Sequence, residues 1–483
     1  MKFFHAFSYK KKIFQSVKNH PYEIATFLLI NAIFWISMPY PNWDFMAYFM
    51  NGKFFFGEST YFEIYRPPFV PLCLGILYLL THSYMLTAFA FSLIASFTFI
   101  YAVNLLVKSY NLDKKTYYWV LFTTPLLWYA GLRVGTELMS VTFILLSLSF
   151  LKQKKNFLAG LALSLASLSR YELLILLPIL LTTKNIKHLF VRMIGFGIPW
   201  LIWAAYSFYL WGSMTYSLLN SFALNIYFRD YLWQNPNPLH FLILGSSLLG
   251  GIYYLYLRIK NKSFKPPFSL KYELILAYMI LALLYSYYKT PLKFERYLYS
   301  LIAPLSILAS ISLKKLFLNK SFFTRIMVIL LTLFTMTAYI IALTSYLENK
   351  TIFERIDFLT SHNIINTSQY YYSDLWVHLN FHNIKSLPVE QLCRGKEVVV
   401  DPSLKYAVIF NYEYCLNSSH AQLIQETPHH IKIYFFNVSN ISYQPILYLD
   451  HIKEISSKLK ENVKKEVCLA LFKVSALCGI PFI

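Results

Sequence analysis

The sequence is poor in glycine, in charged residues and in cysteine, and each scarcity excludes a class of protein. It has 14 glycines in 483 residues, with no Walker-type Gly-Lys-Ser/Thr, no Gly-x-Ser-x-Gly and no His-Glu-x-x-His motif. Nucleotide chemistry on a glycine-rich loop, α/β-hydrolase chemistry and zincin-type proteolysis are therefore excluded. The five cysteines form no Cys-x-x-Cys pair and show no spacing typical of structural zinc.

Charged residues make up 14% of the chain, whereas 57% of it is hydrophobic. Ordinary soluble domains have about a quarter of their residues charged. Apolar runs of roughly 15–22 residues recur, and the short alternating segments of a transmembrane barrel are missing. This composition predicts a polytopic α-helical protein whose first partner is the lipid bilayer. The first run, Glu23 to Met38, has no small-residue cleavage site after it and is expected to remain as an anchor.

The net charge of +21 indicates orientation in the membrane. Of the 44 basic and 23 acidic residues, 31 and 10 precede residue 347, so the whole excess lies in the apolar part. Basic clusters beside spans mark the cytoplasmic side, and no nucleic-acid partner is expected. They place the N-terminus in the cytoplasm of a multi-pass cell-membrane protein. The eleven predicted spans are 22–39, 84–107, 117–131, 136–151, 157–169, 172–183, 190–210, 239–258, 272–288, 297–313 and 326–346.

Three segments between or within these spans carry further predictions. The run Pro67 to Leu80 is expected to lie along the outer interface, because a crossing there would put later lysine clusters outside. The stretch Phe45 to Phe56 is expected to lie amphipathically on the membrane surface. Between Leu158 and Leu181, the polar residues at 170–172 indicate two short helices that meet, with one long bent helix as the alternative.

Residues 347–483 have a balanced charge and are predicted to form a small extracytoplasmic α/β domain, separate from the transmembrane domain 1–346. Its expected strands and helices, from composition and periodicity, are Lys396–Asp401, Tyr406–Phe410, Ile431–Phe436, Glu354–His362 and His451–Lys465. Outside the cell, one or two disulfides could join Cys393, Cys415, Cys468 and Cys478, with free thiols as the alternative and the pairing open.

Asp44 and Arg66, in the loop after the first span, are the first candidates for chemistry. A carboxylate at the outer rim of the bilayer can accept a proton from an acceptor hydroxyl. Arg66 is followed by two prolines that restrict the local backbone, and a guanidinium is well suited to bind a phosphate. The alternatives are a solvated interfacial Asp44 and a structural pair of Arg66 with Glu63 or Glu58.

Two later segments carry the other candidates. Arg133 and Glu137 are four residues apart, so they form either a helix ion pair or a site in which Glu137 supports the site or a metal and Arg133 faces a phosphate. Lys293 and Arg296 lie in a basic outer loop, which indicates either an anionic lipid head group or simple anchoring to phospholipid. Arg170, Arg229 and Asp230 have weaker claims. The loop Trp211 to Leu239, which contains the last two, is either a lid or an interfacial loop.

These motifs together resemble the GT-C superfamily of membrane glycosyltransferases that use lipid-phosphate-linked sugars, such as protein O-mannosyltransferases and aminoarabinose transferases. The resemblance covers roughly Asp44 to Pro304. It consists of the acid with Tyr48, Gly52, Gly57, Tyr61 and Arg66-Pro67-Pro68, then the acid-headed segment that starts at Gly135, then FERYLYSLIAP. The first loop has one Asp where the O-mannosyltransferases have an acid pair. The Trp-Trp-Asp motif of oligosaccharyltransferases is missing, which argues against whole-glycan transfer to Asn.

The resemblance implies an inverting sugar transfer, at the outer face, from a polyprenyl-phosphate donor to a lipid, glycan or protein acceptor. Asp44, with Glu137, would be catalytic. Donor phosphate would contact Arg66, Arg133, Lys293 and Arg296, and the substrate loop would include Tyr48, Glu63, Arg229 and Asp230. No cofactor is expected, and divalent metal is left open without being favoured. A flippase or exporter of lipid-linked sugars is the main alternative, and a scaffold that binds through its C-terminal region is the third. High Lys, Ile and Tyr with little Gly suggests an archaeal or thermophilic source.

Overall fold

The computed structural model divides by its contacts into two compact units. The first comprises Met1–Met214 with Gln234–Glu354, and the second Thr215–Trp233 with Arg355–Ile483. The structure describes residues 20–59, 61–129, 135–222, 234–260, 266–291, 293–318, 346–366, 369, 371–388, 406–410, 421–427 and 430–436. The predicted span 326–346 therefore lies almost wholly outside the described residues, as do Cys393, Cys415, Cys468 and Cys478.

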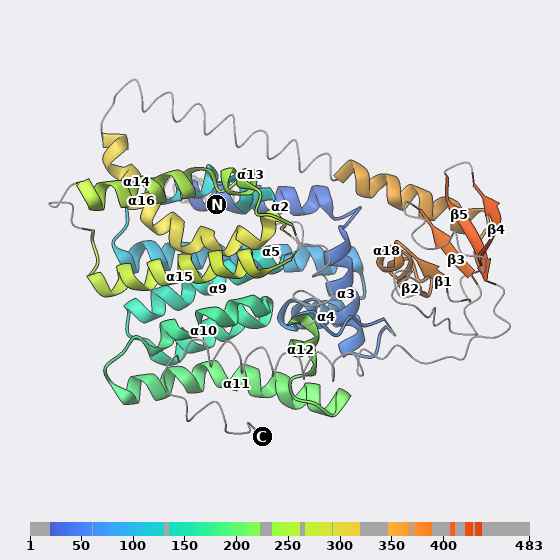
Figure 1. Ribbon diagram of the computed structural model, residues 1–483, viewed down its shortest axis with the longest axis horizontal. Helices are drawn as coiled ribbons and strands as arrows, with labels where there is room; N and C mark the ends of the chain where they lie inside the picture. The colour runs from blue at the N-terminus through green and yellow to red at the C-terminus, as the bar shows by residue number, and fades with distance from the viewer. Residues whose placement is uncertain are drawn as a thin grey trace, which may run out of the picture. The chain divides into compact units, whose positions relative to one another are not determined.

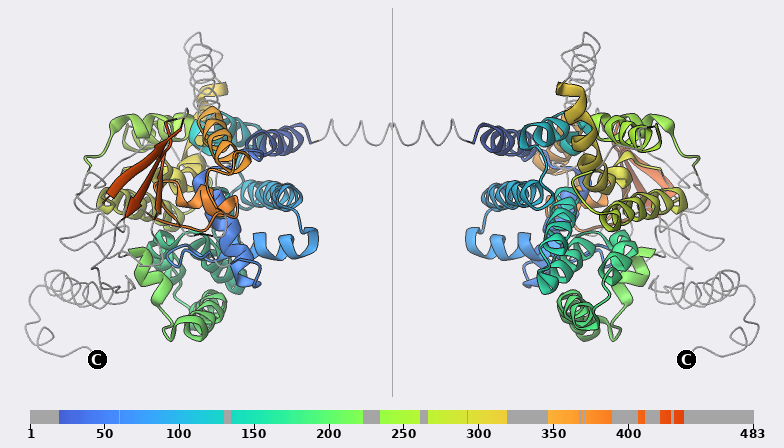
Figure 2. Two further views of the ribbon diagram at one scale, coloured as in Figure 1. Left: turned by 90° about the vertical axis from the view of Figure 1, so that its right-hand side faces the viewer. Right: turned by 90° about the vertical axis from the view of Figure 1, so that its left-hand side faces the viewer.

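The first unit is a bundle of helices that run roughly along one direction (Figures 1 and 2). Its elements are α2 (Pro21–Ser37), α3 (Trp43–Phe55), α4 (Phe69–Thr81), α5 (Tyr84–Tyr110), α6 (Lys114–Phe122), α7 (Pro125–Tyr129), α9 (Thr136–Lys152), α10 (Asn156–Ser169), η1 (Tyr171–Leu181), α11 (Ile186–Trp211), α13 (Pro238–Leu242), α14 (Gly245–Lys260), α15 (Leu270–Lys289), η4 (Glu295–Leu301) and α16 (Ile302–Leu318). The labels η1 and η4 mark 3-10 helices. Helix α3 lies across one end of the bundle (Figure 1).

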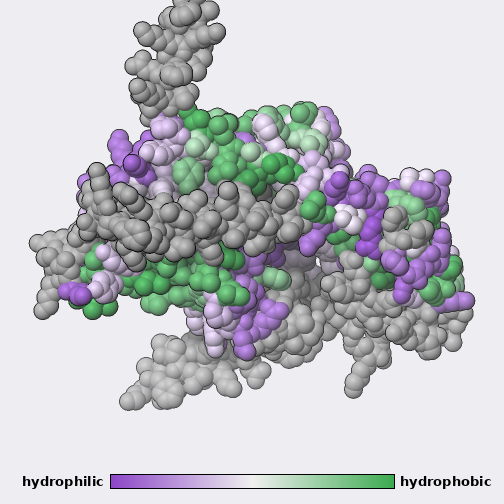
Figure 3. All heavy atoms as spheres, turned by 90° about the horizontal axis from the view of Figure 1, so that it is seen from above, coloured by the Kyte–Doolittle hydropathy of each residue, from purple (hydrophilic) through white to green (hydrophobic). Residues whose placement is uncertain are grey.

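Ten of the eleven predicted spans coincide with helices of this bundle, which confirms a helical fold. Within the described residues, four helices are long and apolar enough to cross a membrane: Tyr84–Tyr110, Ile186–Trp211, Leu270–Lys289 and Glu295–Lys314. The others are shorter or broken, so the number of crossings stays a prediction. Large apolar side chains such as Leu201 and Leu281 are more than 60% exposed, and Figure 3 shows apolar patches on one face of the molecule. Such a surface suits contact with lipid hydrocarbon.

Local sequence signals explain many helix ends. The side chain of Asn42 accepts a hydrogen bond from the backbone of Phe45 and caps α3, and Ser83 and Asp113 cap α5 and α6 in the same way. Helix α11 ends at Gly212, which has a φ of +67°. The predicted break at residues 170–172 is confirmed, because α10 stops at an extended Arg170 and η1 begins at the next residue.

The prediction of a surface-lying helix at Phe45 to Phe56 is wrong in one respect. Residues 45–52 of α3 are all buried, so the helix has no polar face turned to solvent. Part of the reason is its close crossing with α4. A Cβ on Gly52 would meet the backbone of Pro71 and Gly75, and one on Gly75 would meet the backbone of Gly52. Two small residues thus let the helices touch backbone to backbone, which buries the side of α3 that faces α4, while Phe45 and Phe49 pack on Tyr84 of α5.

Helices α10 and α11 make an equally close crossing, and it provides a stability prediction. A Cβ at Gly160 would collide with the backbone carbonyl of Arg192, so Gly160→Ala is expected to force the helices apart at a cost of about 1–3 kcal/mol. Gly197→Ala, on α11 in open space, is the control and should change stability by less than about 1 kcal/mol. Denaturation midpoints of the detergent-purified protein measure both. Equal midpoints for the two variants would contradict this crossing.

The second unit contains a small mixed sheet with strand order β2-β1-β3-β5-β4. Its elements are α12 (Tyr216–Phe222), β1 (Tyr371–Ser373), α18 (Trp376–Phe381), β2 (Ser386–Pro388), β3 (Tyr406–Ile409), β4 (Ala421–Glu426) and β5 (Lys432–Phe436). Strand β1 pairs in parallel with β2 and β3, whereas β3–β5 and β5–β4 are antiparallel. The connection from β1 to β2 passes through α18, as parallel neighbours need a crossover.

The predictions for this unit are only partly met. The expected strands at Tyr406–Phe410 and Ile431–Phe436 correspond to β3 and β5, and the expected helix at Glu354–His362 lies in a helical stretch from 346 to 361. Strands β1, β2 and β4 were not predicted. The expected strand Lys396–Asp401 and helix His451–Lys465 lie outside the described residues. The structure therefore describes a small sheet, and a complete α/β domain stays a prediction.

Candidate active site

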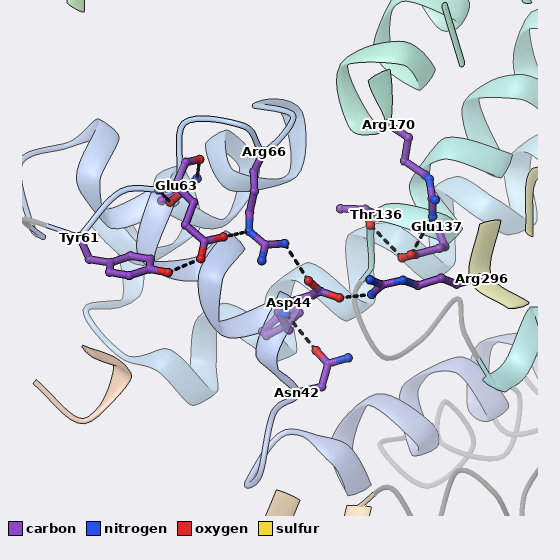
Figure 4. Close-up of polar contacts among 11 residues, drawn as sticks. Asn42, Asp44, Tyr61, Glu63, Arg66, Thr136, Glu137, Arg170 and Arg296 are labelled. Carbon is purple, nitrogen blue, oxygen red and sulfur yellow. Dashed lines mark hydrogen bonds and ion pairs between the residues drawn. The ribbon is translucent and has the colours of Figure 1, made fainter. Parts of the chain in front are cut away.

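Asp44 lies in the first turn of α3, where its carboxylate contacts two arginines from distant parts of the chain (Figure 4). Arg66 Nη1 donates to Asp44 Oδ1 at 2.8 Å, and Arg296 Nη1 donates to Asp44 Oδ2. The side chain of Asp44 is 17% exposed, compared with 7% for Arg66 and 33% for Arg296. The loop after the first span and the start of η4 thus meet at one carboxylate.

The two guanidinium groups determine the charge state of Asp44. Burial by itself would raise the pKa of the carboxyl, but the charges and hydrogen bonds of Arg296 and Arg66 hold that pKa well below its usual range. Asp44 is therefore ionised at physiological pH while both arginines hold it. A carboxylate with such a low proton affinity is a weak base, so proton acceptance requires the arginines to loosen their hold.

Arg66 is positioned by contacts on several sides. Its Nε donates to Glu63 Oε2, and its guanidinium lies over the rings of Tyr48 and Tyr65, at 4.8 and 5.5 Å from their centroids. The pairing with Glu63 that the sequence left as an alternative is therefore present together with the contact to Asp44. Burial raises the pKa of the Tyr48 hydroxyl to about 12, so this phenol stays protonated at neutral pH.

Asn51 holds Glu63 in place, and sequence reasoning missed it. Its side-chain amide donates to the backbone oxygen of Glu63 at 2.9 Å, and its side-chain oxygen accepts from the backbone nitrogen at 2.8 Å. The Tyr61 hydroxyl also donates to the Glu63 carboxylate. An asparagine within an apolar helix is costly to bury without partners, and this was the available signal.

Glu137 forms a second ion-pair cluster at the start of α9. Its Oε1 accepts from Arg170 Nη1 at 2.7 Å, and its Oε2 accepts from the Thr136 hydroxyl at 2.8 Å. Arg170 also donates through Nε to Glu172. The partner of Glu137 in the structure is thus Arg170, to which the sequence gave a weaker claim. Arg133, the partner expected from the spacing of four, lies outside the described residues.

The two clusters face each other across one aromatic ring. Tyr297 of η4 has its centroid 5.8 Å from the Arg296 guanidinium carbon and 6.0 Å from that of Arg170. Figure 4 shows Glu137 and Arg170 beside Arg296. Both arginines lie at the start of a 3-10 helix, because Arg170 precedes η1 and Arg296 is the second residue of η4. The arrangement joins carboxylates that can take up a proton to guanidinium groups that can bind an anion.

The remaining candidates are placed elsewhere or are not described. Lys293 is buried, and its Nζ donates to the backbone oxygens of Tyr288 and Thr290 at the end of α15, the first of them at 2.9 Å. These contacts suit a role in holding the end of that helix. Arg229 and Asp230 lie outside the described residues. Among the residues that are described, no three His, Cys, Asp or Glu side chains are grouped to hold a metal ion.

No family model matches the chain, and no curated protein matches it. Among solved structures, the chain is similar to the crystal structure of ArnT from Cupriavidus metallidurans in the apo state. The sequences are 12% identical, the match covers 87% of this chain and 99% of that chain, and the TM-score is 0.48.

Proposed function

We propose that this protein is a membrane glycosyltransferase of the GT-C type that transfers a sugar from a polyprenyl-phosphate donor. One observation carries the proposal: Asp44, in the first turn of α3, is paired with Arg66 and Arg296 from two separate segments. The carboxylate can accept a proton, and the two guanidinium groups that contact it can bind an anion such as a phosphate. The resemblance to the GT-C superfamily supports this proposal, because it implies a catalytic acid at Asp44 and contacts of the donor phosphate with Arg66 and Arg296.

In the proposed reaction, Arg66 and Arg296 bind the donor phosphate. The acceptor hydroxyl attacks the anomeric carbon from the face opposite the phosphate, so the configuration inverts. The bond between that carbon and the phosphate oxygen breaks, its electron pair stays on the departing polyprenyl phosphate, and the hydroxyl proton passes to Asp44. Glu137, held by Arg170, orients the acceptor or supports the charge that develops on the sugar. No metal is required by this scheme.

The setting of the reaction is also part of the proposal. The distribution of basic residues puts the loop of Asp44 and the C-terminal unit outside the cytoplasm. Nucleotide-activated sugars are not available there, whereas lipid-carried ones are. The acceptor is a lipid, a glycan or a protein.

A transfer assay tests the proposal directly. The purified protein in lipid nanodiscs is incubated with radiolabelled polyprenyl-phosphate mannose or glucose and with lipid, glycan and peptide acceptors. We expect labelled acceptor together with released polyprenyl phosphate. If no acceptor is labelled with either donor, but vesicles that contain the protein move the donor between leaflets, the chain is a flippase and the proposal is wrong.

A further inference from the structure

The two arginines assigned to the donor phosphate are already occupied in this structure. Arg296 donates to Asp44, and Arg66 donates to Asp44 and Glu63. A phosphate that bridges the two guanidinium groups must take the place between them that Asp44 fills, because the Asp44 carboxylate already links Arg66 Nη1 to Arg296 Nη1. Phosphate binding at this place therefore requires one carboxylate to move.

The charges of the cluster lead to the same requirement. Three guanidinium groups face four carboxylates, which gives the cluster one net negative charge. Its members are Arg66, Arg170, Arg296, Asp44, Glu63, Glu137 and Glu172. A phosphodiester brings another negative charge into a poorly solvated place, where repulsion between like charges is strong. Removing one carboxylate from the arginines compensates for that added charge.

Of the two carboxylates that bind Arg66 or Arg296, Asp44 is the one that is free to leave, whereas Glu172 pairs with Arg170. Glu63 is held by the Tyr61 hydroxyl and, through its backbone, by Asn51. Glu137 is buried and is held by Thr136 as well as Arg170. By contrast, the carboxylate of Asp44 is bonded to the two arginines alone among the described residues, and it is more exposed than Glu63 or Glu137.

We infer that the Asp44 carboxylate and the donor phosphate are alternative ligands of the Arg66–Arg296 pair, so that donor binding releases Asp44 for proton transfer. This inference rests on the proposed function. In this exchange the phosphodiester of the donor takes the place of the Asp44 carboxylate. Both groups carry one negative charge and offer two acceptor oxygens to the arginines. Without donor the base is held inactive by its arginines. With donor bound, the carboxylate regains its proton affinity beside the reacting sugar.

The test measures binding of polyprenyl phosphate, the product without sugar, to the full chain in nanodiscs. Asp44→Asn removes the competing charge and keeps the side-chain shape, so the dissociation constant should fall by about tenfold, because the binding-competent fraction of the protein rises. Glu58→Gln is the matched control, since Glu58 is an exposed acid in the same loop that joins neither cluster, and it should bind as wild type does. Unchanged or weaker binding by Asp44→Asn would overturn the inference.

Two further measurements keep the inference testable if Asp44→Asn folds poorly. In wild type carrying 13C-labelled aspartate, addition of polyprenyl phosphate should shift a carboxylate infrared band as one aspartate leaves its guanidinium partners. An unshifted spectrum under saturating ligand would overturn the exchange. Arg296→Gln should weaken binding, and the gain from Asp44→Asn should vanish in that background. These measurements need no sugar transfer. The exchange between Asp44 and phosphate can therefore be disproved while sugar transfer is observed, and sugar transfer can be disproved while the exchange is observed.

Discussion

Replacing Asp44 by asparagine is expected to lower the rate of sugar transfer by about 10²–10⁴-fold, the range for loss of a general base. An amide of the same shape keeps one oxygen that can accept a hydrogen bond from an arginine, but its nitrogen is a donor and the side chain cannot take up the acceptor proton. Because the arginines then hold a neutral group, donor binding should not suffer. The loss should therefore appear in kcat, and the KM for the donor should fall. Initial rates at several donor concentrations separate the two constants.

The control for this experiment is Glu58→Gln, which also removes one negative charge from the loop but contacts neither cluster. It should transfer sugar at the wild-type rate. If Asp44→Asn keeps more than about a tenth of wild-type kcat, Asp44 is not the base. Glu137 would then be the next acid to examine. A loss confined to KM would instead assign Asp44 to donor binding only.

Replacing Arg170 by methionine is expected to destabilise the first unit by about 3–5 kcal/mol, because it leaves the buried carboxylate of Glu137 without its charge partner. Methionine fills a similar volume, so the effect of lost packing should be small. The free energy of unfolding, from denaturant titration of the detergent-purified protein, measures the loss. The double variant Arg170→Met/Glu137→Gln removes the unpaired charge and should recover most of the stability.

An ion pair at the surface provides the comparison. Arg258 Nη2 lies 3.0 Å from Glu273 Oε2, but the arginine side chain is 38% exposed, so water screens the pair. Arg258→Met should therefore cost no more than about 1 kcal/mol. Equal losses for Arg170→Met and Arg258→Met would mean that Glu137 and Arg170 are not buried together as described.

The positions of the helices were largely readable from the sequence, because long apolar runs between charged clusters leave few alternatives. The internal breaks were less readable. The predicted span 117–131 is divided into α6 and α7 just before Pro125, and the predicted span 239–258 is divided before Gly245, which has a φ of +52°. Pro125 lacks a backbone N–H and Gly245 has a positive φ, and each of these residues interrupts a helix. The breaks are hard to predict because the apolar run continues through both positions.

The site was only partly predictable. The sequence marks Asp44, Arg66 and Arg296 as candidates, because charged residues at span ends on the outer side need an explanation. That they meet at one carboxylate could not be derived, since Asp44 and Arg296 are 252 residues apart and only tertiary packing brings them together. Local spacing also favoured Arg133 as the partner of Glu137, whereas the described contact comes from Arg170, 33 residues away. Sequence patterns reveal neighbours along a helix but not neighbours across a bundle.

Because η1 is a 3-10 helix, its residues extend over a greater distance than the same number of residues in an α-helix. At about 2.0 Å per residue its 11 residues extend roughly 22 Å, whereas an α-helix of equal length extends about 16 Å. Its hydrogen-bond pattern would use the backbone oxygen of Ile175 to accept from Pro178, which has no N–H, and the Tyr278 hydroxyl donates to that oxygen instead, at 2.6 Å. Eleven residues thus extend from Arg170 nearly as far as 15 would in an α-helix. Removing one residue from η1 would change the distance between its ends by about 2 Å.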